Sequence, residues 1–125
     1  MDPTGKHIAA FAKDCYEELE SWYPVYRFRD VCAKVTAVGR GTSGYTSKNG
    51  YPVTPDTTAE NVDSSDFDAV IIPSGGYAPD RMRRHKAMVD LACDVFARGK
   101  AHGVICHGGW MLVSANVLRG RWQIR

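Results

Sequence analysis

The chain has 125 residues, a length that fits one domain with a single core, and we interpret residues 1–125 as one domain. Hydrophobic residues make up 44% and charged residues 24% of the sequence, as in ordinary globular proteins. The net charge of +2, with both signs interspersed, argues against a nucleic-acid partner, and no apolar run approaches the ~18 residues that a membrane span requires.

The first half of the chain predicts a strand, a helix and a second strand. Residues 7–12 form an apolar run between two lysines, which is typical of a buried strand. Large side chains then recur at helical spacing, at Leu19, Trp22, Tyr23 and Tyr26. Pro24 lies inside this pattern and lacks an N–H to donate, so we expect a kinked helix. Residues 33–39 alternate in polarity and predict the second strand.

The second half predicts an excursion followed by two strand–helix units. Residues 39–66 are rich in small and polar residues, and the Asn-Gly pair at 49–50 indicates a hairpin within them. The run 67–73 predicts a strand buried on both faces. A helix over 78–100, a strand over 102–106 and a helix over 109–118 follow, with Gly99 and Gly120 as helix stops. The basic run at 81–86 is interpreted as a solvated helix face.

This alternation of strands and helices predicts an α/β domain with a mostly parallel sheet. Ligands of such folds bind beyond the carboxyl ends of the strands. Three segments are expected to meet there: residues 14–20, 73–80 and 106–109.

Cys106 follows one of these strands and precedes a pair of glycines and a helix. Such a strand–turn–helix junction presents a nucleophile outward, as in the elbow of hydrolases. The helix N-terminus favours the thiolate, and free backbone N–H groups, with Gly75 and Gly76 opposite, can stabilise an oxyanion. The alternative is an inert cysteine buried in the core.

The other cysteines are scattered, at Cys15, Cys32 and Cys93, with no CxxC pair and no metal-ligand spacing. The N-terminal segment lacks the features of a secretory signal. We therefore expect reduced thiols in a cytoplasmic protein, with no metal and no cofactor.

The segment 103–121 resembles the nucleophile segment of the ThiJ/PfpI superfamily, which includes PfpI-type peptidases and protein deglycases and is class I glutamine amidotransferase-like. Residues 67–84 and 17–30 are similar to its strand-and-glycine segment and its first helix, and 47–56 to its hairpin. The likeness covers about residues 7–121 in order. It implies a flavodoxin-like three-layer sandwich.

The resemblance also implies roles for single residues. Cys106 corresponds to the nucleophile, and Glu20 to an acid held protonated against the sulfur. His107 corresponds to a histidine paired with an acid of a neighbouring subunit, at the position of Asp80, and to a binding residue. The alternatives are a solvated carboxylate for Glu20, as expected for Glu17 and Glu18, a capping or interface histidine for His107, and a helix cap for Asp80.

Three features depart from the family pattern. Ser74 stands between the proline and the two glycines, which affects the oxyanion donor. His102 precedes the cysteine strand and is interpreted as a loop residue. The chain stops soon after the elbow helix, so the family's further strands and closing helix are absent, and one sheet face is expected to be exposed.

The leading functional hypothesis is a cysteine hydrolase or lyase whose Cys106 thiolate attacks a carbonyl, as in PfpI-like peptidases or glutathione-independent glyoxalases and deglycases. Its substrate would be a small carbonyl compound or a peptide. The alternatives are a redox-sensing or stress-protective protein with an oxidisable Cys106, an inactive interaction module, and an amidotransferase subunit, which lacks its His-x-Glu pair here. A homodimer or larger homo-oligomer is expected, with Trp22, Tyr23 and Tyr77 as interface or core aromatics.

Overall fold

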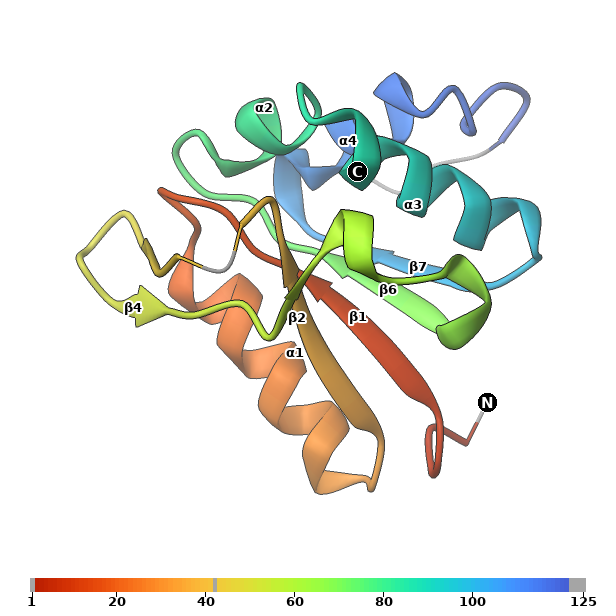
Figure 1. Ribbon diagram of the computed structural model, residues 1–125, viewed down its shortest axis with the longest axis horizontal. Helices are drawn as coiled ribbons and strands as arrows, with labels where there is room; N and C mark the ends of the chain where they lie inside the picture. The colour runs from red at the N-terminus through yellow and green to blue at the C-terminus, as the bar shows by residue number, and fades with distance from the viewer. Residues whose placement is uncertain (1, 42, 122–125) are drawn as a thin grey trace.

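The computed structural model describes residues 2–41 and 43–121. Its main sheet has five parallel strands in the order β5-β2-β1-β6-β7 (Figure 1). The strands are β1 His7–Phe11, β2 Lys34–Gly39, β5 Thr57–Thr58, β6 Ala69–Ile72 and β7 Ala101–Val104. The predicted α/β class with a mostly parallel sheet is therefore confirmed.

Helices lie on both faces of this sheet, which makes three layers (Figure 1). The helix α1 Glu18–Asp30 covers one face. The other face carries α2 Ala78–Met82, α3 Lys86–Ala97 and α4 Gly109–Ser114. This is the expected flavodoxin-like sandwich, and α1 runs through Pro24 as one uninterrupted helix.

Side chains alternate between two apolar layers along the central strands. Val70 and Ile72 of β6 pack in the larger layer with side chains of α3 and α4, among them Met88, Leu91 and Met111. Ile71 belongs to the smaller layer on the α1 side. All four residues of β6 are buried, as expected for a strand covered on both faces.

The excursion after β2 contains the predicted hairpin. Its strands, β3 Tyr45–Thr46 and β4 Pro52–Val53, pair antiparallel around a turn in which Gly50 has φ +93°. The sequence did not predict β5, because two threonines in a polar segment give no strand signal. Two 3-10 turns, Ala59–Asn61 and Ser64–Asp66, lead from it towards β6.

The prediction of one helix over 78–100 is wrong in one respect, because this segment contains two helices, α2 and α3. His85 leaves the helical region, with φ −101° and ψ 106°, and its Nε2 pairs with Glu60 Oε1 at 2.8 Å. The break lies at this contact with a distant segment, and residues 80–98 around it contain no glycine or proline. The final helix also ends earlier than predicted: Asn116 adopts φ +56°, and the Val117 N–H donates to the Leu112 carbonyl.

The interpretation of His102 as a loop residue is also wrong. His102 lies in β7, where its Nε2 is 2.9 Å from the Ala92 carbonyl oxygen and its ring contacts Phe96 edge-on. This histidine therefore ties β7 to α3. The strand predicted over 102–106 already included this position, and the structure confirms that His102 belongs to the strand.

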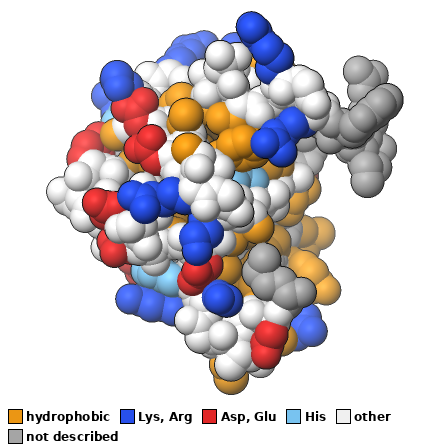
Figure 2. Space-filling view, turned by 90° about the vertical axis from the view of Figure 1, so that its right-hand side faces the viewer, with side chains coloured by type: hydrophobic (Ala, Val, Ile, Leu, Met, Phe, Trp, Pro, Cys, Tyr) orange, Lys and Arg blue, Asp and Glu red, His pale blue; other side chains and the backbone are white. Residues whose placement is uncertain are grey.

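The described surface carries acidic and basic side chains with hydrophobic ones between them, as Figure 2 shows for one face. Tyr23 and Tyr77 are 70% and 64% exposed, whereas Trp22 packs against the core. Among the residues described, no helix has the length and apolar character needed to cross a membrane.

Candidate active site

Cys106 lies at the carboxyl end of β7, at the start of the turn that leads into α4. Ile105 still donates to the Ile72 carbonyl, and the 3-10 turn Cys106–Gly108 begins directly after it. Cys106 adopts φ +54°, a conformation that non-glycine residues rarely take. A Cβ on Gly108 would lie 2.6 Å from the Ile72 carbonyl oxygen, so glycine permits this close approach. The result is an elbow that leaves Cys106 exposed.

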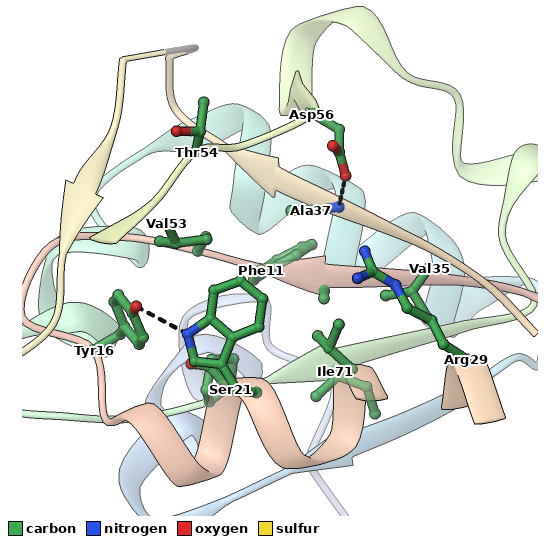
Figure 3. A pocket seen from close by; sticks show the side chains of 15 residues that line it. Phe11, Tyr16, Ser21, Arg29, Val35, Ala37, Val53, Thr54, Asp56 and Ile71 are labelled. Atoms are coloured by element: carbon green, nitrogen blue, oxygen red, sulfur yellow. Dashed lines mark hydrogen bonds between the residues drawn. The ribbon is translucent and has the colours of Figure 1, made fainter. Parts of the chain in front are cut away.

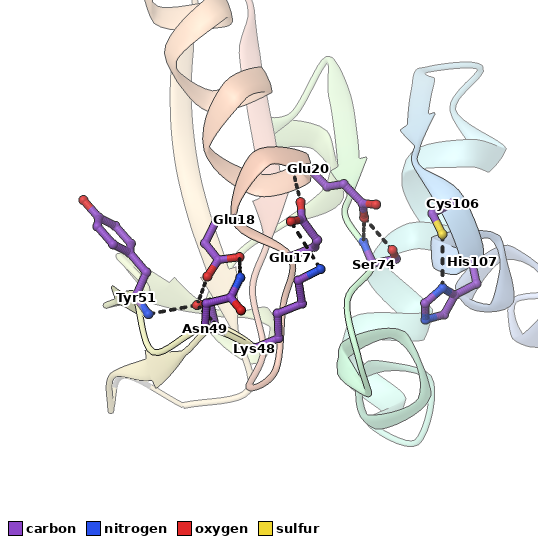
Figure 4. A network of polar contacts seen from close by, with 10 residues as sticks. Glu17, Glu18, Glu20, Lys48, Asn49, Tyr51, Ser74, Cys106 and His107 are labelled. Atoms are coloured by element: carbon purple, nitrogen blue, oxygen red, sulfur yellow. Dashed lines mark hydrogen bonds and ion pairs between the residues drawn. The ribbon is translucent and has the colours of Figure 1, made fainter.

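His107 contacts the sulfur directly. Its Nδ1 lies 3.3 Å from Cys106 Sγ, although the two residues are adjacent in sequence (Figure 4). Side chains of neighbouring residues usually diverge, and the unusual backbone at Cys106 brings these two together. An imidazole at this distance can exchange a proton with the thiol, which is the arrangement that activates a cysteine nucleophile.

Glu20 reaches the same edge of the sheet from the first turn of α1, where it contacts Ser74 (Figure 4). The backbone N–H and the hydroxyl of Ser74 both donate to Glu20 Oε2, at 2.8 and 2.5 Å. Ser74 itself is only 1% exposed. Because Oε2 accepts two hydrogen bonds, a proton on this carboxyl would sit on Oε1, which has no partner among the described residues.

The structure does not join Glu20 to the sulfur by a hydrogen bond among the described residues. Glu20 bonds to Ser74, and Cys106 to His107, as two separate pairs. The serine that departs from the family pattern is therefore the residue that fixes the acid. A polar residue at the carboxyl end of a buried strand was the sequence signal for this role.

The two glycines after Ser74 differ in what they can offer an oxyanion. The Gly76 N–H donates to the Cys15 carbonyl at 2.8 Å, so it is already used within the fold. Gly75 pairs with Tyr16 in an isolated antiparallel bridge, and its own N–H has no partner among the described residues. The backbone N–H of His107 is likewise without one. Gly75 and His107 are thus the available donors of the predicted set.

Asp80 lies in α2 and pairs with two arginines of its own chain. Its carboxylate is 3.1 Å from Arg83 Nε and 2.5 Å from the guanidinium Nη2 of Arg84. Within the described chain it makes no ion pair with His107. An acid for His107 from this position would have to come from a second copy.

Trp110 contacts both His107 and Arg83, one of the arginines that pair with Asp80. These contacts were not predicted from the sequence. Its ring centroid lies 5.0 Å from that of His107, and the Arg83 guanidinium lies 5.2 Å above it. Trp110 stands three residues after His107, a spacing that places two side chains on one face of a helical turn. Its ring therefore forms one wall for the imidazole.

We therefore expect Trp110→Ala to slow alkylation of Cys106 by iodoacetamide. An aromatic pair contributes ~0.5–1.5 kcal/mol, so the rate should fall about threefold to tenfold as the imidazole loses its wall. Trp110→Phe, which keeps a ring, should restore most of the rate. An unchanged rate in Trp110→Ala would show that His107 is held by other contacts.

Glu18 fastens the hairpin to α1, and so it is not the solvated carboxylate that the sequence suggested. It accepts from the Ser47 hydroxyl and, at 3.1 Å, from the Asn49 side-chain amide (Figure 4). The Ser47 hydroxyl oxygen in turn accepts from the Tyr51 N–H at 2.8 Å. Glu17 accepts from the Glu20 N–H and pairs with Lys48 at 3.5 Å, which makes a second tie to the hairpin.

These contacts predict a pH dependence. The pKa of Glu18 lies below its ordinary value, chiefly because the Ser47 hydroxyl donates to it. Because the pKa of Glu18 is lower in the folded chain, its hydrogen bonds to the hairpin stabilise the fold fully above the ordinary carboxyl pKa. This stabilisation is lost as the pH falls through the pKa of the folded chain. Protection of the Tyr51 amide, measured as its exchange rate relative to the intrinsic rate at the same pH, should therefore fall on acidification. In Glu18→Gln, which cannot titrate, this part of the fall in protection should be absent.

An open groove of about 360 Å³, called the Cys106 groove below, lies between α1 and the residue before Cys106. Leu19, Glu20, Tyr23 and Pro24 of α1 line it together with Ile105, the residue before the cysteine. Its walls are apolar apart from the Glu20 carboxyl.

Comparisons with known proteins confirm the resemblance seen in the sequence. Residues 6–123 match the DJ-1/PfpI family. A deglycase of Pyrococcus abyssi is 37% identical over 114 residues, which cover 91% of this chain and 68% of the relative. The deglycase PfpI of Pyrococcus furiosus is 38% identical over 106 residues, which cover 85% of this chain and 63% of the relative. The chain thus spans about two thirds of their length.

A solved structure leads to the same conclusion. It is a two-domain protein of Anabaena variabilis that contains DJ-1/ThiJ/PfpI-like and ferritin-like domains. The two chains superpose with a TM-score of 0.89 at 31% sequence identity. The match covers 92% of this chain and 33% of that one, and it confirms the expected fold.

Proposed function

This chain belongs to the DJ-1/PfpI family, and on that premise we propose that Cys106 is the nucleophile of a deglycase-type reaction at a carbonyl carbon. The observation that carries the proposal is the exposed Cys106 sulfur at an elbow, 3.3 Å from His107 Nδ1. The two Pyrococcus relatives are named deglycases, which favours the carbonyl adducts of amines as the substrate class.

In the first step, the Cys106 thiolate adds to the carbonyl carbon. A C–S bond forms, the C=O π electrons move to the oxygen, and that oxygen takes a proton from the His107 imidazolium. The N–H groups of Gly75 and His107 are the donors proposed to stabilise the oxygen before it is protonated. A protonated Glu20, fixed by Ser74, would direct its one acidic proton from Oε1 towards the sulfur and favour the thiolate.

The experiment that tests the reaction class uses one peptide whose lysine carries a methylglyoxal adduct. Mass spectrometry after incubation with the chain distinguishes release of the intact, unmodified peptide from cleavage of its backbone. We expect release without cleavage. Cleavage would favour the peptidase-type alternative, and neither product above the no-enzyme control would contradict the proposal.

Association of two copies belongs to the same proposal. His107 Nε2 has no partner among the described residues, and Leu19 and Tyr23 beside the groove are 75% and 70% exposed. A second copy that covered this surface could bring an acid such as Asp80 to His107. Light scattering should then give twice the mass of the chain, whereas a monomer would leave Asp80 without that role.

A further inference from the structure

A second cavity lies on the other side of α1 from the Cys106 groove, between this helix and the sheet (Figure 3). Its volume is about 230 Å³. Three alanines, Ala10, Ala12 and Ala37, are among its lining residues, and their short side chains leave the space that larger ones would fill. A dry cavity of ~150 Å³ accepts benzene, so this one has room for a substituted ring.

The walls and the mouth of the cavity differ in polarity. Trp22, Val25 and Ile71 contribute apolar surface to the walls. Arg29 and Asp56 are both exposed and lie at one end of the cavity. The Arg29 guanidinium is on the side of the cavity where the Asp56 carboxylate lies (Figure 3). Neither has an ion-pair partner among the described residues. Asp56 Oδ2 accepts from the Ala37 N–H at 2.7 Å, which fixes its position, and Oδ1 has no partner in the described chain.

The far end of the cavity holds one unsatisfied polar group. The Ser21 hydroxyl is shielded from solvent and has no hydrogen-bond partner within the described part of the chain. Buried polar groups of this kind normally have a partner. Ser21 and Arg29 are eight residues apart on α1, or about 12 Å along the helix axis. A para-hydroxyphenyl amino acid covers this span together with a hydrogen bond at either end.

We propose that this cavity binds a free α-amino acid with a para-hydroxyphenyl side chain. The ring lies against Trp22 and the aliphatic walls. The Ser21 side chain rotates so that its hydroxyl, shielded in the free chain, bonds to the phenolic hydroxyl. At the mouth the α-carboxylate pairs with Arg29 and the α-ammonium with Asp56. A zwitterion satisfies both opposite charges at once, whereas a simple carboxylate or amine would satisfy one and face the other unpaired.

Isothermal titration calorimetry with L-tyrosine tests this site on the whole chain. Tyramine lacks the carboxylate and 3-(4-hydroxyphenyl)propanoate lacks the ammonium, and each should bind at least about tenfold more weakly, because each loses a charge-assisted hydrogen bond. Arg29→Met and Asp56→Asn should weaken tyrosine binding by a similar factor. Both substitutions are at exposed positions, so folding is preserved. No saturable binding, or equal affinity for all three compounds, would overturn the proposal.

Ser21 provides the sharpest control. L-Phenylalanine lacks only the phenolic hydroxyl, so it should bind about threefold to tenfold more weakly than tyrosine. In Ser21→Ala this difference should vanish while the phenylalanine affinity stays unchanged. A difference that persisted would overturn the assignment of Ser21. Cys106→Ser should bind tyrosine like the parent chain, since this site does not depend on the sulfur, and a loss of binding there would place tyrosine in the Cys106 groove.

Discussion

Replacing Cys106 by serine is expected to reduce release of peptide from its methylglyoxal adduct by about a thousandfold or more, as removal of a catalytic nucleophile commonly does. Serine has nearly the shape of cysteine but is a far weaker nucleophile at neutral pH. The elbow and the His107 contact should therefore survive in the variant. The loss would come from the missing C–S bond and not from misfolding.

Cys32 supplies the matched control for this substitution. It is exposed and has positive φ, +61° against +54° for Cys106, but no histidine contacts its sulfur in the described chain. Cys32→Ser should leave the release rate unchanged. Equal rates for the two variants and the parent chain would remove the catalytic role of Cys106.

Replacing Gly75 by alanine is expected to lower the free energy of unfolding by about 3 kcal/mol or more. Gly75 has φ +140°, and a Cβ there would lie 2.2 Å from the Cys15 carbonyl oxygen and 2.6 Å from the Tyr16 backbone. These are backbone atoms, which cannot rotate away. The bridge between Gly75 and Tyr16 would have to open, and the end of β6 would move with Ser74 and Glu20.

Gly50→Ala is the control that separates the cost of a positive φ from the cost of backbone atoms lying too close to the new Cβ. Gly50 also has positive φ, +93°, but no atom of the described residues lies within 4 Å of a Cβ built there. It should cost only about 1 kcal/mol, the usual penalty of the left-handed region. Chemical denaturation of both variants measures the difference. Similar losses would mean that crowding at Gly75 is relieved by a backbone shift.

The fold was largely predictable because its elements depend on local patterns. The apolar run at 67–73 could only be a buried strand, and the Asn-Gly pair at 49–50 marked the hairpin. The elements that failed depend on distant partners. His85 leaves the helix to pair with Glu60, and β5 forms because β2 offers it an edge.

The candidate site follows the same division. Cys106 was predictable because the junction of strand, glycines and helix is written in consecutive residues. The partners of the acidic residues were not, since Glu18 meets Ser47 and Glu20 meets Ser74 across 29 and 54 residues of chain. Trp110 could have been found from its helical spacing to His107. The contact of Arg83 with its ring could not, because it depends on how α2 packs against α4.

The central claim, that the fold holds Cys106 as a reactive thiolate, is tested most directly by alkylation of the native chain with iodoacetamide at pH 7, followed by peptide mass spectrometry. Exposure alone would make Cys106 and Cys32 react alike. We predict that Cys106 reacts at least about tenfold faster than Cys32, and that His107→Ala brings the two rates together. A Cys106 that reacts no faster than Cys32 would contradict the account.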